Sequence, residues 1–384
     1  MINKEKLIKA KKNYFNFINL MKIEDDEYSF TYGSKSSPYA LCFAIFGYNL
    51  LRQKEFITNN KNLLSTKLIK NLHKKKIERI EKKIKISTDK QYLQLLCFTL
   101  SCLKILNKEN DLNLKNEIEE LIPESINTSL ETNGVFECKG GTGNYAMFIA
   151  IILIYARDYL KVKCNYKISE WVDLHIKNMN CNSLWGQFYE INHHQFQNGY
   201  HQYEILEYLK YDYSNKIINN LDQISCIADS KGQFAPWPGG AACHDYDACF
   251  LLSIKSSFNK NNLRLFEKII STILQSQNSD GGFCESLNIR PRSINNIVLF
   301  LRHLYSANRS IFKERFYQLI TLQRLKHNKI HSYVSDKPRE WSESNLWDSW
   351  FRMMTIARLD CKVSPENISN WGFIEFPGIG YFRK

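Results

Sequence analysis

The sequence predicts an all-α protein, an α/α toroid (barrel) of six to seven helical hairpins with repeats of about 50 residues. Gly (16) and Pro (8) are scarce in a chain of 384 residues, which disfavours a many-turned β sandwich. Aromatic residues make up 13%, which favours a large aromatic interior or cavity wall. Finally, aromatic turns recur along the chain, and most are followed by an apolar segment of helical period.

The turns share a Gly-x-Phe or Gly-Gly-Phe pattern. They lie at Gly134-Val135-Phe136, Gly186-Gln187-Phe188, Gly232-Gln233-Phe234 and Gly281-Gly282-Phe283. Tyr28-Ser29-Phe30 and His331-Ser332-Tyr333 resemble degenerate copies, and one turn between Phe30 and Phe136 is missing. A unit repeated at this interval predicts one helical hairpin per repeat.

Each hairpin is expected to contain one buried and one half-exposed helix. The buried inner helices are apolar on nearly every side and begin near Tyr39, Gln91, Tyr145, Asn198, Asp245, Ile294 and Asn345. The amphipathic outer helices are expected at Glu5–Leu20, Asn60–Ile84, Leu112–Ile122, Ile168–Met179, Asn215–Ile227, Leu263–Gln277 and Ile311–Leu325. Residues 1–384 then form a single toroid domain, with an aromatic, Gly-rich tail at residues 365–384 packed over the barrel. An open solenoid is the alternative.

Composition also limits the partners and the compartment. The net charge of +13 comes largely from Lys-rich amphipathic stretches such as residues 67–85, which are typical of solvated helix faces, and no nucleic-acid-binding motif accompanies them. We therefore expect no nucleic-acid partner, while peripheral contact with an anionic membrane stays open. Eleven cysteines without a CxxC pair, and a start without a signal-peptide pattern, predict reduced thiols and a cytoplasmic protein. No prediction is made of oligomeric state.

The starts of the inner helices are expected to face a common cavity. Helix N-termini offer free N–H groups and the positive end of the helix dipole, which suit polar or anionic ligands. Capping would explain one Asn or Asp per helix, but not the density of His, Tyr, Arg and Trp in this layer. The predicted substrate-binding residues are Tyr39, Tyr145, His193, His194, Asn198, Trp237, Arg290, Arg292, Asn295, Asn296, Trp341, Asn345 and Asp348.

Two segments carry the candidate catalytic residues. Asp245 and Asp247 follow a Gly-Gly turn and His244, and two helical residues in that spacing diverge by about 200°, so one of them can face the cavity squarely. The alternative for this pair is helix capping. His201 and Glu204 are spaced to share one helix face as an acid–base pair, beside Tyr200; a hydrogen-bonded structural role is the alternative. No metal site is predicted.

One of the turns resembles a known family. The segment Gln277–Phe283 (QNSDGGF) resembles the QxxDGGF element of the prenyltransferase and squalene-cyclase repeat, found in terpenoid cyclases and protein prenyltransferase β-subunits. The resemblance implies an α/α toroid with its active cavity at one end of the inner helices. His244–Asp247 occupies the position of the DxDD general acid of class II terpenoid cyclases, although Tyr246 stands where a further Asp is expected. The zinc ligands of protein prenyltransferases have no counterpart.

Three functions follow from these patterns. The preferred one is an isoprenoid cyclase or prenyltransferase, in which Arg290 and Arg292 would hold a diphosphate and Mg²⁺ would accompany it. The alternative is a carbohydrate-active lyase, epimerase or hydrolase acting on an oligosaccharide through Tyr, His and Asp acid–base chemistry, with Trp237 and Trp341 as stacking platforms. A non-catalytic hairpin scaffold is the third. No other cofactor is predicted.

Overall fold

Helices account for nearly all the regular structure of the chain. The computed structural model describes residues 4–110, 114–138, 140–186, 191–212, 218–254, 260–286, 294–305, 309–324 and 329–383. Within these ranges the β-structure consists of two small hairpins, β1 (Lys22–Glu24) with β2 (Glu27–Tyr28) and β3 (Lys329–Ile330) with β4 (Arg339–Glu340). The prediction of an all-α protein is confirmed.

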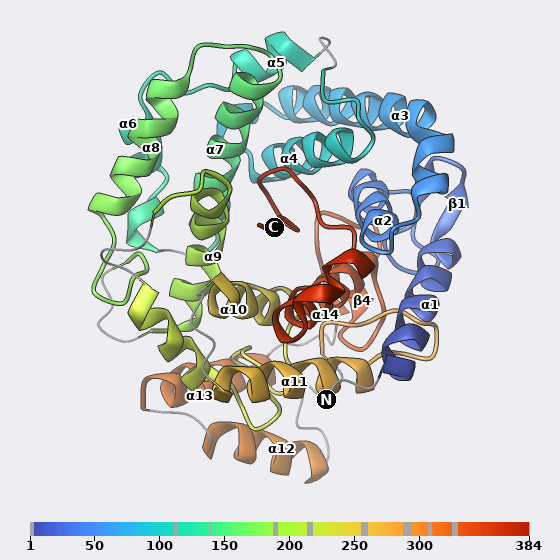
Figure 1. Cartoon of the computed structure of the whole chain (residues 1–384), viewed down its shortest axis with the longest axis vertical. Helices are drawn as coiled ribbons and strands as arrows, with labels where there is room; N and C mark the ends of the chain where they lie inside the picture. The colour runs from blue at the N-terminus through green and yellow to red at the C-terminus, as the bar shows by residue number, and fades with distance from the viewer. Residues whose placement is uncertain are drawn as a thin grey trace.

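An inner ring of six helices surrounds the centre of the molecule (Figure 1). Each helix packs on the next in chain order, and the last closes the ring against the first. Almost every residue of these helices is buried, because one side faces the ring interior and the other the outer layer; this explains their apolar composition on all sides. The inner helices are α2 (Pro38–Leu50), α4 (Lys90–Ile105), α7 (Thr142–Asp158), α9 (His193–Tyr208), α10 (Ala242–Ile254) and α14 (Leu346–Val363).

The outer layer covers this ring with amphipathic helices, as the toroid prediction requires (Figure 1). Its longer members are α1 (Lys4–Leu20), α3 (Lys54–Glu81), α8 (Asn165–Lys177), α11 (Lys260–Gln275) and α13 (Arg309–Arg324). Shorter helices complete it, namely α5 (Lys115–Glu119), α6 (Ile126–Thr132) and the 3-10 helix η4 (Ile218–Ile227). Three further 3-10 turns lie at η1 (Ile86–Thr88), η3 (Val135–Glu137) and η5 (Pro365–Asn370).

One predicted inner helix takes a different place. The segment beginning at Ile294 forms α12 (Ile294–Tyr305), which lies outside the ring and packs on α13 (Figure 1). Its Leu301 and Tyr305 are 59% and 92% exposed, whereas Phe300 is buried. The apolar composition of α12 therefore does not reflect burial on every side, and among the described residues the ring closes with six helices.

The DGGF turn ties three helices together. The side-chain amide of Gln277 donates hydrogen bonds to the carbonyl oxygens of Ala10 in α1 (3.0 Å) and Gly281 (2.8 Å). The backbone N–H of Phe283 donates to Oγ of Ser349 in α14 (2.8 Å), and its ring is buried. The residues that carry the family resemblance thus join α1, α11 and α14.

Gly281 in this turn has a backbone that only glycine adopts without strain. Its φ is +89°, and a Cβ added there would overlap the backbone carbonyl of Asn13 in α1. We expect Gly281→Ala to lower the free energy of unfolding by about 2–4 kcal/mol, as measured by chemical denaturation. Gly140→Ala is the control, because a Cβ at Gly140 meets no atom within 4 Å. Equal stability of the two variants would contradict this account of the turn.

The C-terminal tail closes one end of the ring. The C-terminus lies at the centre of the ring in Figure 1, and the tail packs against the C-terminal ends of inner helices. The ring of Phe376 meets Tyr155 of α7 at 6.0 Å, and that of Tyr381 meets Tyr208 of α9 at 5.4 Å. The guanidinium of Arg358 in α14 donates a hydrogen bond to the carbonyl of Tyr381.

Within the described residues, no helix combines the length and apolar character that crossing a bilayer requires.

Candidate functional site

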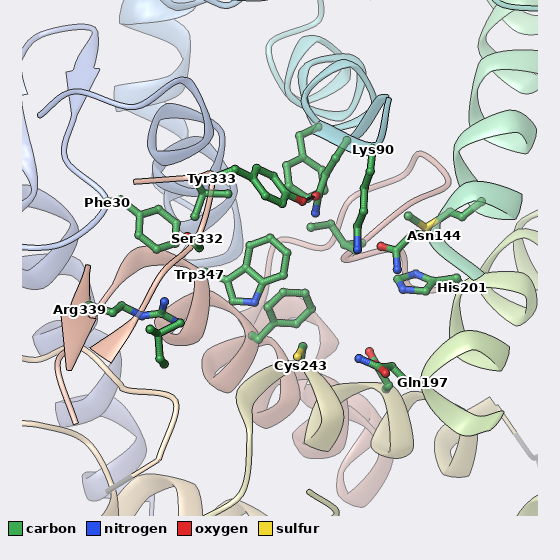
Figure 2. Close-up of a pocket in the computed structure, with 18 residues that line it drawn as sticks. Phe30, Lys90, Asn144, Gln197, His201, Cys243, Ser332, Tyr333, Arg339 and Trp347 are labelled. Carbon is green, nitrogen blue, oxygen red and sulfur yellow. Dashed lines mark hydrogen bonds between the residues drawn. The ribbon is translucent and has the colours of Figure 1, made fainter. Parts of the chain in front are cut away.

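A cavity of about 270 Å³ lies at the end of the ring where the inner helices begin (Figure 2). Side chains from the N-terminal parts of α4, α7, α9, α10 and α14 line it, together with the β3–β4 segment and Ile379 of the tail. The lining residues are Phe30, Lys90, Gln94, Phe98, Asn144, Met147, Gln197, His201, Cys243, Asp247, Ile330, Ser332, Tyr333, Val334, Arg339, Trp347, Phe351 and Ile379. Of the predicted site residues, His201 and Asp247 are among these lining residues.

Aromatic rings form one wall of the cavity. Trp347 of α14 packs against Phe351 (5.2 Å between centroids) and Phe98 of α4 (6.2 Å). Tyr333, from the segment between β3 and β4, also lines the cavity; its ring meets Tyr39 at 5.7 Å and its hydroxyl is hydrogen-bonded to Gln94. This wall offers several π-faces and edges to a bound molecule.

The two aspartates of α10 point to different places, as their spacing predicts. Asp247 lines the cavity, whereas Asp245 forms a buried ion pair with Arg352 of α14 and accepts a hydrogen bond from the N–H of Phe234 (2.7 Å). The turn before α10 fits around this pair: Gly240 has φ +73°, and a Cβ there would overlap the carboxylate of Asp245. The structure thus gives Asp245 a role in positioning the turn.

Asp247 is a buried acid with an unusual environment. Its side chain is 2% exposed, and among the described residues none donates a hydrogen bond to its carboxylate. Burial, reinforced by the nearby Glu204 and Asp245, raises the pKa of Asp247 well above its ordinary value. The carboxyl group that faces the cavity therefore holds its proton to higher pH than an exposed aspartate does.

His201 of α9 lines the same cavity as a neutral ring. It is 8% exposed, and its Nδ1 is buried without a hydrogen-bond partner. Burial and the charge of Lys90 lower the pKa of His201 to about 3, so the imidazole is neutral and keeps one ring nitrogen free to accept a proton. The predicted partner Glu204 lies off the cavity, fully buried, and burial raises its pKa well above the usual range. Tyr200 is also buried, with its ring against Tyr246 and Phe250 at 5.3 Å and 5.1 Å.

The other predicted histidines lie outside the lining. His193 pairs with Glu314 of α13, and His194 is exposed at the protein surface. His244 packs its ring against Trp237 (5.5 Å), and burial together with His193 and His194 lowers its pKa to about 3. These residues gather at the junction of α9 and α10 with the outer layer.

Several predicted binding residues connect the helices to each other. The hydroxyl of Tyr39 donates to the carbonyl of Gln91 (2.7 Å), and that of Tyr145 is hydrogen-bonded to Ser129 (3.1 Å). Asn198 accepts a hydrogen bond from the N–H of Gly143 (2.9 Å), which joins α9 to α7. None of the three lines the cavity, although the ring of Tyr39 meets that of the lining residue Tyr333.

Asn345 and Asp348 do not line the cavity, but Asp348 contacts a residue that does. Asn345 caps α14, accepting a hydrogen bond from the N–H of Asp348 (2.9 Å). Asp348 in turn pairs with Arg339 (3.3 Å), a lining residue that also approaches Glu285 (3.6 Å). Burial and the adjacent Asp348 raise the pKa of Glu285. The charge of Arg339 is thus matched by two acidic side chains.

The remaining predicted residues are not part of this cavity. The rings of Trp237 and Trp341 meet at 5.8 Å and pack around Phe300 of α12, away from the lining. Arg290 and Arg292 lie outside the described residues, as do the side chains of Asn295 and Asn296. In the part of the chain that the structure describes, no group of three or more His, Cys, Asp or Glu side chains has the geometry of a metal site.

Sequence reasoning missed Lys90, Gln94 and the aromatic wall. The missing turn lies between Phe30 and Phe136, so no motif marked the start of α4 as part of the cavity layer. The period still places a helix start there, and that signal could have identified Lys90. Trp347 and Phe351 lie within a strongly apolar helix, where sequence does not separate cavity wall from core.

No sequence-family model matches the chain, and no curated protein matches it. Among solved structures, the chain is similar to the type II terpene cyclase MstE from Scytonema in its apo form, with a TM-score of 0.49 and 12% sequence identity. The similarity covers 94% of this chain and 99% of that chain. The chain is thus distantly similar to a terpene cyclase over almost its whole length.

Proposed function

We propose that the chain is an enzyme that protonates an unsaturated, isoprenoid-like hydrocarbon in the central cavity and thereby cyclises or isomerises it. The observation that carries this proposal is Asp247, a buried carboxyl group with a raised pKa that lines an aromatic cavity without a hydrogen-bond partner among the described residues. A carboxylic acid in such surroundings has no group to share its proton with except a bound molecule.

The aromatic wall supports the same reaction. Protonation of an alkene breaks its π bond, forms a new C–H bond with the Asp247 proton and leaves a carbocation on the neighbouring carbon. Ring faces attract cations, and the wall of Phe98, Trp347 and Phe351 supplies several of them within one cavity. A second alkene of the same chain can then attack the cation and form a carbon–carbon bond.

His201 completes the proton balance. As a neutral imidazole facing the cavity, it can accept the proton lost from the carbon beside the final cation, so that a new alkene forms. One proton enters from Asp247 and one leaves to His201. Solvent then reprotonates the aspartate and takes up the proton from the histidine. The product is an isomer of the substrate, and the reaction requires no oxidant or reductant.

Solvent deuterium tests this function. The panel of polyprenes consists of farnesol, geranylgeraniol, squalene, farnesyl diphosphate and geranylgeranyl diphosphate. We expect the purified protein in D₂O to convert at least one of them into an isomer that carries one deuterium, detected by mass spectrometry. Release of inorganic diphosphate with a product free of deuterium would instead indicate ionisation of the diphosphate. Conversion of oligosaccharides, with every polyprene left unchanged, would support the carbohydrate alternative.

A further inference from the structure

Lys90 is a cation without a matching anion in the cavity. It is the first residue of α4 and lines the cavity, and among the described residues no carboxylate forms an ion pair with its ammonium group. The adjacent Asp89 is already engaged, since it caps α4 through the N–H of Tyr92 (3.1 Å) and pairs with Arg79 of α3 (2.8 Å). The other cation of the lining, Arg339, has two acidic partners.

The position of the Lys90 ammonium group adds further positive charge at this place, because two helices begin beside it. Lys90 stands at the N-terminus of α4, and its Nζ also lies over the N-terminus of α7: a Cβ added to the N-cap residue Gly141 would be 3.1 Å from it. Both helix ends carry positive partial charge. Lys90 as a whole residue is exposed, while desolvation around its ammonium group lowers its pKa. An anion placed beside Nζ would satisfy the lysine and both helix ends together.

Two neutral polar groups stand next to Lys90. Figure 2 shows its amine close to the side chains of Asn144 and His201. His201 is 8% exposed with Nδ1 unpartnered, and the influence of Lys90 on its pKa places the two side chains within electrostatic range. Among the described residues, neither Asn144 nor His201 has a side-chain hydrogen bond. Three polar groups therefore converge at one side of the cavity, away from the wall formed by Phe98, Trp347 and Phe351.

We infer that Lys90, Asn144 and His201 form a subsite for an anionic group, a carboxylate or a phosphate ester, at one end of the substrate. The apolar remainder of the substrate lies against Phe98, Trp347 and Phe351. The substrate class is thus an amphiphile with an anionic head rather than a plain hydrocarbon. This inference rests on the proposed function in one respect, that the cavity is the substrate site.

Binding of matched probes tests the subsite. The probes share one apolar chain and differ in the head: farnesol is neutral, farnesoic acid carries a carboxylate, and farnesyl diphosphate carries phosphates. We expect calorimetry on the wild-type protein to find tighter binding of at least one anionic probe than of farnesol. In Lys90→Gln that probe should bind about 10–100-fold more weakly, which is the loss of one charge-assisted hydrogen bond, while farnesol binding changes less than about threefold.

Two variants serve as controls. Lys90→Arg keeps the charge and should bind the anionic probe within about fivefold of the wild type. Lys74→Gln removes the same charge from an exposed position on α3, outside the cavity, and should leave binding of every probe unchanged. If Lys90→Gln does not fold, added NaCl replaces it as the test, since salt should weaken binding of the anionic probe to the wild type and spare farnesol.

The outcomes separate the sources of the anion and the two proposals. Loss of farnesyl diphosphate binding alone assigns a phosphate, and loss of farnesoic acid binding alone assigns a carboxylate. Equal binding of all probes by the wild type, or an anionic probe that binds Lys90→Gln as tightly as the wild type, would overturn the subsite. Because binding is measured without turnover, Lys90-dependent binding without deuterium incorporation would reject the proposed reaction and leave the subsite intact.

Discussion

Replacing Asp247 with asparagine is expected to lower kcat by about 10³-fold or more, because the amide cannot donate the proton that starts the proposed reaction. The change preserves size and shape, and no described residue depends on Asp247 for a hydrogen bond. Substrate binding should therefore change little. Isomer formation from the active polyprene, followed by mass spectrometry, measures the loss, and calorimetry measures the binding.

Glu204→Gln provides the comparison for this variant. Glu204 is a second buried carboxyl group with a raised pKa, but it does not line the cavity. We expect its loss to lower kcat by less than about tenfold. A result in which Glu204→Gln abolishes turnover and Asp247→Asn retains it would transfer the acid role to Glu204 and reject the one proposed for Asp247.

The Asp247→Asn variant should also differ from the wild type in how its stability depends on pH. The pKa of Asp247 is raised above its ordinary value of 3.8 in the folded protein, so the folded state holds this proton to higher pH than the unfolded chain does. The contribution of the group to stability is fully present below about pH 3.8 and is lost as the pH rises through the folded pKa. Asparagine does not titrate, and Asp247→Asn should therefore gain stability relative to the wild type in thermal melts as the pH rises above about 3.8.

The repeat pattern was sufficient to predict the fold. Turns such as Gly281-Gly282-Phe283 reappear at the interval of a helical hairpin, and the inner helices between them are almost entirely buried. The same reasoning failed for α12, because apolar composition indicates that a helix is buried but does not identify the element on which it packs. Phe300 packs on Trp237 and Trp341 outside the ring, while Leu301 and Tyr305 face outward.

The site was harder to predict, for a geometric reason. Sequence places residues at the start of an inner helix, but the rotation of the helix decides which side chain enters the cavity. Asp245 and Asp247 are equal as sequence candidates, and only the pairing of Asp245 with Arg352, which is 107 residues away, separates them. Lys90 could not be identified from the sequence for a different reason. What marks it as a candidate is that no carboxylate pairs with it among the described residues, and ion pairs can be assigned only in the three-dimensional structure.

Asp245→Ala is expected to lower the free energy of unfolding by about 3–5 kcal/mol, since it leaves Arg352 charged and buried without its carboxylate partner. Arg352 is 3% exposed, and its remaining hydrogen bonds go to the carbonyls of Gly239 (3.5 Å) and Glu285 (3.3 Å), which cannot neutralise it. The N–H of Phe234 also loses its acceptor. The variant should melt about 4–6 °C below the wild type in a scan at neutral pH.

The cause of this loss can be separated from any loss of activity. Burial raises the pKa of Asp245 although Arg352 opposes it, whereas the Asp245 carboxylate raises the pKa of Arg352 in spite of burial. The double variant Asp245→Leu/Arg352→Met removes both charges and should therefore recover most of the stability that Asp245→Ala loses. If Asp245→Ala instead melts like the wild type and loses all turnover, Asp245 acts in the chemistry, as its sequence position allowed, and the structural role assigned to the pair is wrong.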